Sequence, residues 1–325
     1  MSNRREFLRR TFLGAAAAAV PGSFFSDALA SDSVNRKAFK PLPVACMSYS
    51  FNGLMREGMM DIFHFFETCR YRYNLDAAEI WSGMFTSTEE EYINKVHRAL
   101  EERQLYVPNI AVDAALILAS GNADPVKFRE IQDRYMQIGK QLGVGFVRFD
   151  AGPYMLRGRK EVDGWTGEEF DTLVARYKEL AQFAYDNGFK IGPENHWGPE
   201  RCWVHMEKLI RAVDHPGFGV SLHVGNWMPE SPETSVQDNE VADIACARWI
   251  GHTHFDWVTC ENTELLQHKM NLLRDAGYQG YYCAEHHSAQ NEYNLTEVQI
   301  SKIRAVLTNW NNGGKGELIP PRRRP

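Results

Sequence analysis

Short apolar runs alternate with longer amphipathic stretches along the chain from residue 43 onward. The short runs are rich in β-branched and aromatic residues, which is typical of buried strands, whereas the longer stretches carry apolar residues at helical spacing. The predicted strands are residues 44–51, 75–81, 106–112, 146–151, 190–196, 219–224, 249–254 and 281–285. The predicted helices are residues 59–71, 89–103, 125–142, 168–187, 201–213, 239–248, 264–276 and 296–309.

Each predicted strand is followed by a predicted helix, so the chain carries eight βα units. Gly143, Gly188 and Gly277 stand where helices end before the next strand, as is common at helix C-termini. Eight such units close into a (β/α)8 barrel, the TIM barrel of the α/β class, here as a single domain over residues 43–312. The competing architecture is an open doubly wound sheet, but no glycine-rich phosphate-binding turn follows an early strand.

The first thirty residues have the layout of an export signal. A basic start, Arg4-Arg5-Glu6-Phe7-Leu8, precedes an alanine-rich apolar run, and Ala28-Leu29-Ala30 offers small residues for cleavage. The adjacent arginines resemble the twin-arginine signal, which predicts a periplasmic or otherwise exported protein. An uncleaved anchor stays open, although the apolar run is short for a bilayer span. The predicted division is a signal peptide at 1–30, a linker at 31–42, the barrel at 43–312 and a flexible tail at 313–325.

The charge of the chain argues against one class of partner. The full chain has a formal net charge of −6, and removal of residues 1–30 would take away four arginines, one glutamate and one aspartate, leaving −8. An acidic surface repels phosphate backbones, so we expect no nucleic-acid partner. Hydrophobic residues make up 44% of the chain, which is enough for one large core. The six cysteines are scattered singly, and those in predicted strands are expected to be buried free thiols. An exported protein could form a disulfide, but the spacing of the cysteines does not indicate one.

Residues that bind metals gather where the predicted strands end. In barrels of this kind the chemistry is found at the C-terminal ends of the strands. There the chain places Glu194-Asn195-His196, His223, His252, His254 and Glu285. Two glutamates and at least two histidines at one rim are enough to hold a divalent metal ion with open positions for a substrate.

The order of these motifs is similar to that of a known family. The motifs that carry the likeness are Ser48-Tyr49-Ser50-Phe51, Glu79, Glu194-Asn195-His196, Gly225-Asn226, His252-Thr253-His254 and Glu285. In this order they resemble the xylose-isomerase-like barrel superfamily, which includes sugar isomerases, epimerases and inosose dehydratases. The resemblance covers residues 43–310. It implies a metal-dependent enzyme that removes a proton next to a carbonyl group and forms an enediolate.

The resemblance also implies which residues bind the metal. In the family a glutamate, an aspartate, a histidine and a glutamate at strands five to eight are the ligands. These positions fall on Glu194, His223, His254 and Glu285. His223 departs from the pattern: either its imidazole replaces a carboxylate ligand, or the site has lost its role. As a ligand, it would make the site neutral around a single divalent ion and favour Mn, Co, Zn or Fe over Mg²⁺.

Two further departures concern the substrate. Three residues beyond the ligand of the sixth strand, where the epimerases have a histidine, this chain has Asn226. The family's ketose epimerases also keep an arginine just beyond the histidine of the seventh strand, and residues 255–260 contain none. A simple ketose 3-epimerase is therefore disfavoured, whereas the barrel and the metal are not.

Catalytic and substrate-binding roles follow from the same resemblance. Glu194 and Glu285 can act as bases through oxygens that do not bind the metal, and His196 is the reserve candidate because imidazole titrates near neutral pH. The residues expected to contact the substrate are Asn109, Arg148, Trp197, Asn226, Trp227 and His252. Internal roles stay open for several of them, because strand-end tryptophans also cap cores and a histidine can support a ligand from behind.

The expected function is a metal-dependent sugar isomerase or epimerase acting on a non-phosphorylated sugar or keto-sugar. A lyase or hydratase that cleaves 3-keto-glycosides by β-elimination ranks beside it, because the same proton removal can expel a leaving group. A non-catalytic sugar-binding barrel is the alternative from another class. The expected partner is a small carbohydrate; no membrane is expected once the signal is removed, and a homo-oligomer stays open.

Overall fold

The computed structural model describes residues 42–119, 123–152, 160–228 and 236–313. The predicted signal peptide, nearly all of the predicted linker and the predicted tail beyond Gly313 lie outside the described residues. Within the described ranges, no helix combines the length and the apolar character needed to cross a membrane.

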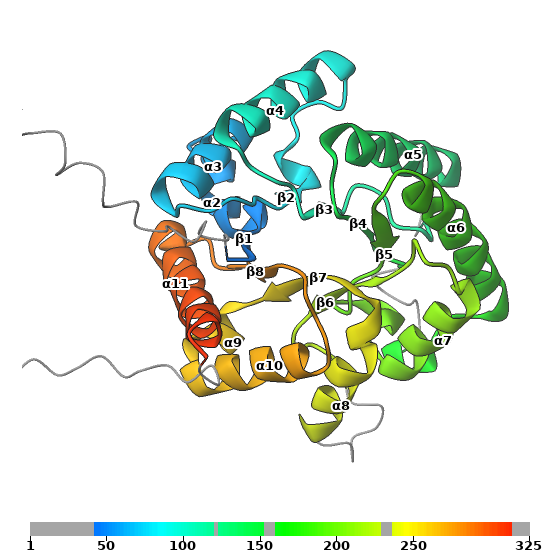
Figure 1. Ribbon diagram of the computed structural model, residues 1–325. Coiled ribbons are helices and arrows are strands. Elements are labelled where there is room, and N and C mark those ends of the chain that lie inside the picture. Colours follow the sequence, from blue (N-terminus) through cyan, green and yellow to red (C-terminus); the bar gives the residue numbers. More distant parts are fainter. Residues whose placement is uncertain (1–41, 120–122, 153–159, 229–235, 314–325) are drawn as a thin grey trace, which may run out of the picture. The chain divides into compact units, whose positions relative to one another are not determined.

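Eight parallel strands form the centre of the molecule (Figure 1). They are β1 (Val44–Cys46), β2 (Ile80–Trp81), β3 (Asn109–Val112), β4 (Phe146–Phe149), β5 (Lys190–Gly192), β6 (Val220–His223), β7 (Ile250–Phe255) and β8 (Tyr282–Ala284). Hydrogen bonds link them into two arcs, β1-β8-β7-β6 and β2-β3-β4-β5. Single bridges from Met47 to Glu79 and from Glu194 to Ser221 join the arcs, so the sheet closes. The predicted (β/α)8 barrel is confirmed.

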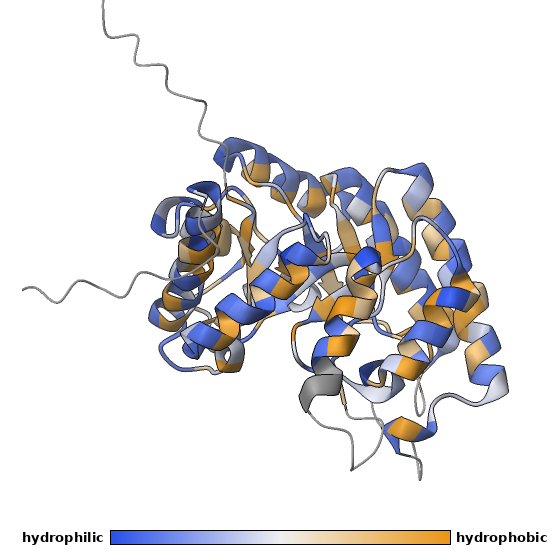
Figure 2. Ribbon diagram, turned by 60° about the horizontal axis from the view of Figure 1, so that its bottom comes forward, coloured by the Kyte–Doolittle hydropathy of each residue, from blue (hydrophilic) through white to orange (hydrophobic). Residues whose placement is uncertain are grey.

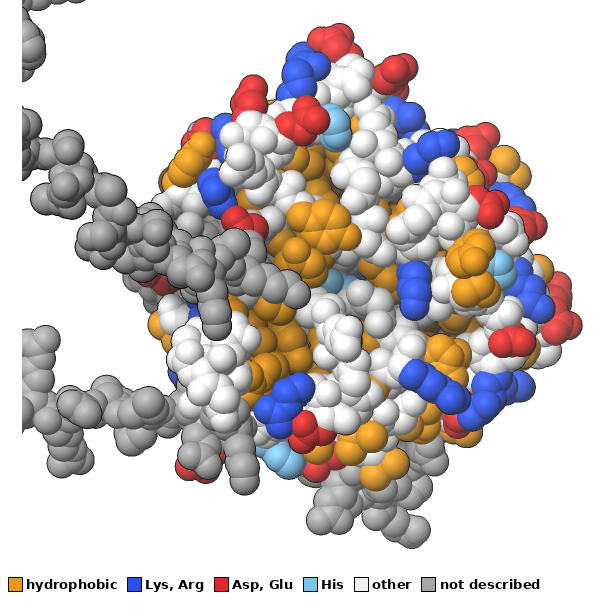
Figure 3. Space-filling model, in the orientation of Figure 1, with side chains coloured by type: hydrophobic (Ala, Val, Ile, Leu, Met, Phe, Trp, Pro, Cys, Tyr) orange, Lys and Arg blue, Asp and Glu red, His pale blue; other side chains and the backbone are white. Residues whose placement is uncertain are grey.

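Helices surround the strands (Figure 1). They are α2 (Asn52–Arg56), α3 (Ile62–Glu67), α4 (Glu90–Arg103), α5 (Pro125–Leu142), α6 (Gly167–Asp186), α7 (Trp203–Val213), α8 (Val236–Cys246), α9 (Trp257–Glu261), α10 (Thr263–Asp275) and α11 (Glu292–Asn311). Hydrophobic and hydrophilic stretches alternate along them in Figure 2, as expected of helices that pack on one face. On the face seen in Figure 3, charged side chains lie mostly over the outer helices and apolar groups nearer the middle.

The helix predicted at residues 125–142 is present with those bounds as α5. Its start is fixed locally, because the Asp124 side chain accepts a hydrogen bond from the Val126 amide and Pro125 occupies the first turn. Its end is fixed by Gly143, whose φ of 64° lies in the left-handed region. Neighbouring residues therefore set both ends of this helix.

The strand predicted at residues 44–51 is wrong beyond Cys46, because Ser48–Phe51 form a 3-10 turn that leads into α2. The alternation of serine with aromatic residues imitates a strand. In the folded chain, however, both serine side chains are buried hydrogen-bond acceptors: Ser48 Oγ accepts from the amide of Trp81 and Ser50 Oγ from the amide of His286. These bonds tie the turn after β1 to the ends of β2 and β8.

The interior of the barrel is lined on one side by a small cluster of mostly small side chains. Its members are Ala45, Met47, Ala77, Ala111 and Cys283. The larger core lies elsewhere and includes the fully buried rings of Phe51, Phe65, Phe66 and Tyr177. Small side chains inside the barrel leave room for buried polar groups, several of which lie there, as described next. All six cysteine side chains are buried, which confirms the prediction for those in the predicted strands.

Candidate metal centre

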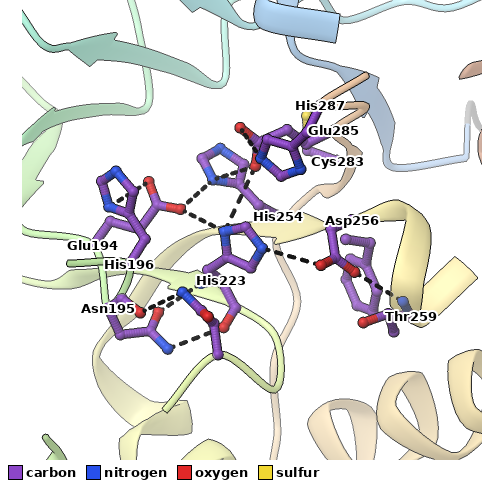
Figure 4. A network of polar contacts seen from close by, with 12 residues as sticks. Glu194, Asn195, His196, His223, His254, Asp256, Thr259, Cys283, Glu285 and His287 are labelled. Atoms are coloured by element: carbon purple, nitrogen blue, oxygen red, sulfur yellow. Dashed lines mark hydrogen bonds and ion pairs between the residues drawn. The ribbon is translucent and has the colours of Figure 1, made fainter. Parts of the chain in front are cut away.

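Four side chains from neighbouring strands converge at the C-terminal end of the barrel (Figure 4). Glu194 follows β5, His223 ends β6, His254 belongs to β7 and Glu285 follows β8. One ligand atom of each lies within 4.8 Å of the others, and all four residues are buried. The structure thus brings together the four residues predicted to hold a metal, while their role as ligands stays a prediction.

The ligand atoms face a common point. Glu194 Oε1 lies 3.0 Å from Nδ1 of His223 and 2.8 Å from Nδ1 of His254. Glu285 Oε2 lies 3.7 and 3.5 Å from the same two nitrogens, and within the described part of the chain it has no hydrogen-bond partner. Two carboxylate oxygens and two imidazole nitrogens in this arrangement are a donor set that suits Mn, Fe, Co or Zn. The residues present therefore fit a divalent ion.

The electrostatics of the cluster are those of a site built for positive charge. Burial opposes a charge on His223, but its contacts with Asp256 and Glu194 outweigh this and raise its pKa to about 10. Burial likewise opposes a charge on Glu285, yet His254 and His287 lower its pKa to about 2. In the metal-free protein, protonated imidazoles therefore balance the negative charge of the buried carboxylates.

The second ring nitrogen of His254, Nε2, contacts a buried carboxylate. His254 Nε2 lies 2.7 Å from Glu79 Oε1, and both side chains are fully buried. Glu79 also accepts hydrogen bonds from Asn109 Nδ2 at 2.7 Å and Cys283 Sγ at 2.9 Å, and it lies 2.6 Å from His252 Nε2. Glu79, His252 and His254 could hold a metal by their spacing. Because donors already occupy both oxygens of Glu79, we assign this group to the support of His254.

The far side of His223 also faces a carboxylate, but a more exposed one. His223 Nε2 lies 3.7 Å from Asp256 Oδ2 (Figure 4). Asp256 is the N-cap of α9, and its Oδ1 accepts a hydrogen bond from the Thr259 amide at 2.8 Å. The backbone of His223 is held by Asn195, which accepts from its amide at 2.7 Å and donates to its carbonyl oxygen at 3.0 Å.

A buried arginine holds the second oxygen of Glu194. Arg148 Nη1 donates to Glu194 Oε2 at 2.7 Å and lies 3.2 Å from His196 Nε2, while Nη2 donates to Asp113. Burial lowers the pKa of His196 to about 3, with Arg148 contributing, although Glu194 opposes the shift. His196 is therefore neutral at working pH, and both oxygens of Glu194 are engaged.

Each of the six residues predicted to contact the substrate has a contact within the protein. Asn109 and His252 are buried and contact the carboxylate of Glu79. Trp227 is also buried, and its Nε1 donates a hydrogen bond to Asp243. The Trp197 ring lies against that of His196, with centroids 3.9 Å apart and the planes tilted by 32°. Asn226 Nδ2 donates to the carbonyl oxygen of Asn195. Arg148 pairs with Glu194, as described above. Contact with a substrate stays a prediction for all six.

The sequence assigned no role to Asp256 or Asn195 and favoured a supporting or surface position for His287 rather than a ligand. His287 Nε2 lies 3.3 Å from Glu285 Oε1, and its ring stacks on that of His223 at a centroid distance of 5.7 Å. A local signal existed for Asp256, because aspartate directly after a strand is one of the residues preferred at a helix N-cap. No local signal shows that its second oxygen turns toward a histidine on another strand.

Comparisons with known proteins agree with this architecture. The family model described as "Xylose isomerase-like TIM barrel" matches residues 71–306. No curated protein matches the chain by sequence.

Three solved structures have a similar fold. One is a 3-keto-D-glucoside 4-epimerase from E. coli in its apo form, with 14% identity, a TM-score of 0.57, and coverage of 75% of this chain and 94% of that one. Another is the probable 3-DHS dehydratase AsbF from Bacillus anthracis, with 15% identity, a TM-score of 0.60, and coverage of 82% and 99%. The third is a xylose isomerase-like TIM barrel protein from Mycobacterium smegmatis in complex with magnesium, with 15% identity, a TM-score of 0.57, and coverage of 80% and 97%. At such identities the likeness shows the fold alone.

Proposed function

The chain belongs to the xylose isomerase-like TIM barrel family, and on this premise we propose that it is a metal-dependent sugar isomerase or epimerase. Its substrate would be a non-phosphorylated sugar or keto-sugar, and its reaction would pass through an enediolate. The observation that carries the proposal is the convergence of two glutamates and two histidines, buried, with their ligand atoms within 4.8 Å of one another.

A single divalent Mn, Co, Zn or Fe ion would supply positive charge that stabilises negative charge developing on the substrate's oxygens. Glu194, His223, His254 and Glu285 would hold it. The expected export of the protein supports a free sugar or glycoside as substrate, because phosphorylated sugars are intracellular metabolites.

Glu285 is the proposed base. Glu194 has one oxygen between the two histidines and the other on Arg148, so neither oxygen is available to take a proton from carbon. Among the residues that the structure describes, Glu285 Oε1 by contrast contacts only His287, at 3.3 Å, and the His287 side chain is 47% exposed. A proton taken by Glu285 can therefore pass to His287 and from there to solvent.

The same asymmetry favours a second candidate, a lyase or hydratase acting on 3-keto-glycosides. Epimerisation places and removes protons on opposite faces of a carbon and so needs a second proton-transfer group. Elimination needs one base and an acid near the leaving group. With Glu194 engaged by Arg148, one well-placed base is what the site offers. His196, the reserve candidate from the sequence, is neutral and therefore cannot supply the acid.

Metal content tests the proposal first. Wild-type protein should hold one transition metal per chain after chelation and reloading, measured by elemental analysis. Glu194→Gln and His223→Ala should each lose it. His268→Ala is the matched control, because His268 pairs with Glu240 on the outer helices and is 52% exposed. A metal-free wild type would leave the non-catalytic sugar-binding barrel as the better account.

Isotope exchange then tests the chemistry. Loaded protein in D₂O should incorporate deuterium at the carbon next to the carbonyl group of a ketose or a 3-keto-glycoside. An epimer as product would identify the epimerase, and loss of the glycosidic substituent would identify the lyase. Absence of exchange with every substrate of both classes would refute proton removal next to a carbonyl group.

A further inference from the structure

The imidazole of His223 lies between the ligand cluster and a carboxylate. Its Nδ1 faces Glu194 Oε1 at 3.0 Å, and its Nε2 faces Asp256 Oδ2 at 3.7 Å. His223 stands where the family usually has an aspartate ligand. The position that departs from the family pattern thus has a second carboxylate, Asp256, on the far side of its ring.

The position of Asp256 is fixed independently of His223. As the N-cap of α9, Asp256 has its Oδ1 bound by the amide of Thr259 at 2.8 Å. This bond anchors one oxygen and leaves Oδ2 directed at the imidazole (Figure 4). Asn195 fixes the backbone of His223 from the other side through two hydrogen bonds. The distance between His223 Nε2 and Asp256 Oδ2 is thus fixed by contacts outside the pair.

A neutral imidazole can bind a metal through Nδ1 only if its single proton sits on Nε2. A carboxylate next to Nε2 selects that tautomer, orients the ring and makes the ligand nitrogen more basic. Glu79 has the same relation to His254, with 2.7 Å between Glu79 Oε1 and Nε2. Both histidines of the cluster therefore have a carboxylate on the far side of the ring.

We propose that Asp256 is a positioning residue for the metal centre, and that the His223–Asp256 pair replaces the single aspartate ligand usual in the family. The negative charge of that aspartate is kept but moved outward by one imidazole ring. The inference rests on the proposed metal centre. It adds that this centre is tuned from α9, through a residue that does not touch the metal.

A double-mutant cycle on metal affinity tests the pair. Asp256→Asn keeps the N-cap, because asparagine caps helices as well as aspartate does. It should lower the affinity for Co²⁺ and Zn²⁺ by about 10-fold to 100-fold, measured by competition with a chromophoric chelator. It should also change the visible absorption spectrum of the Co²⁺-loaded protein, which a purely structural role would leave alone.

In a His223→Asp background the family's ligand is restored and Asp256 has no imidazole to orient. There, Asp256→Asn should cause no loss of affinity. An equal loss in both backgrounds, or an unchanged affinity and spectrum in the His223 background, would overturn the inference. If His223→Asp does not fold, the spectrum and affinity of Asp256→Asn alone decide.

Asp61→Asn is the matched control. Asp61 is also an N-cap, of α3, and its Oδ1 lies 3.0 Å from His64 Nδ1, but both side chains are at least half exposed and far from the cluster in the sequence. This variant should bind metal as the wild type does. A wild type without any metal would overturn the proposed function together with this inference, whereas a metal-binding wild type with an unaffected Asp256→Asn would overturn the inference alone.

Discussion

The two histidines of the candidate metal centre use the same device in different surroundings. His254 and its carboxylate Glu79 are fully buried and 2.7 Å apart. His223 is nearly buried, but its carboxylate Asp256 is 22% exposed and lies 3.7 Å away. A carboxylate without water must be satisfied by protein groups. Besides His254, Glu79 contacts Asn109 on β3, His252 on β7 and Cys283 on β8. We therefore expect the fully buried pair to be needed for the fold, and the partly exposed His223–Asp256 pair to tolerate substitution without unfolding of the barrel.

The largest effect should come from Glu79→Gln. An amide would place an N–H group against donors that now meet a carboxylate, so the metal-free protein should lose about 3–5 kcal/mol of unfolding free energy. Urea denaturation at neutral pH measures this. Asp256→Asn in parallel is the comparison, and equal losses in the two variants would contradict the distinction between a buried and an exposed support.

Metal affinity should rise with pH, by about one power of ten per pH unit for each displaced proton. The sign follows from His223, whose pKa of about 10 means that metal-free protein carries a proton there at pH 7. Metal binding must remove it, so lower pH favours the proton. Calorimetry in buffers of different ionisation enthalpy counts the protons released. Zero release between pH 6 and 8 would contradict this charge state.

The same proton makes the stability of the metal-free protein depend on pH. The pKa of His223 rises from 6.5 to about 10 on folding. Its contribution to stability is full below about pH 6.5 and is lost as pH rises through about 10. Metal-free protein should melt at a lower temperature at pH 9.5 than at pH 7. In metal-loaded protein His223 would bind the metal as a neutral imidazole and would not titrate in this range. The difference in melting temperature between pH 7 and pH 9.5 should therefore be smaller.

Asp256→Asn should change the unfolding free energy by less than about 1 kcal/mol, because its ion pair is partly exposed and asparagine preserves the cap of α9. Thermal melting of the metal-free variant checks this. A loss comparable to that of Glu79→Gln would show that Asp256 supports the fold rather than the metal.

The smallest effect should be that of His268→Ala. Its pair with Glu240 is half exposed, and such pairs contribute between about 0 and 1 kcal/mol. Neither metal content nor melting temperature should move measurably. A clear loss of metal in this variant would mean that removal of any histidine disturbs binding, and it would weaken the case built on His223.

Much of the fold could be read from the sequence, because its signals are local. The strand and helix periods come from neighbouring residues, as do the cap of α5 at Asp124 and its end at Gly143. The strand prediction failed for the serine-rich stretch after β1. There the hydroxyl groups of Ser48 and Ser50 accept hydrogen bonds from the amides of Trp81 and His286, which are distant in the chain. Local patterns cannot report partners of that kind.

The sequence by itself determined the barrel and, through the order of its motifs, the four residues that meet at the strand ends. Only the tertiary structure decided which side chains contact these four residues on the side away from the cluster. Glu79 and His254 are 175 positions apart, and Arg148 and Glu194 are 46 apart. Which side chains face each other across a closed sheet depends on the tilt and register of all eight strands. Alternation along one strand fixes only which face a residue occupies.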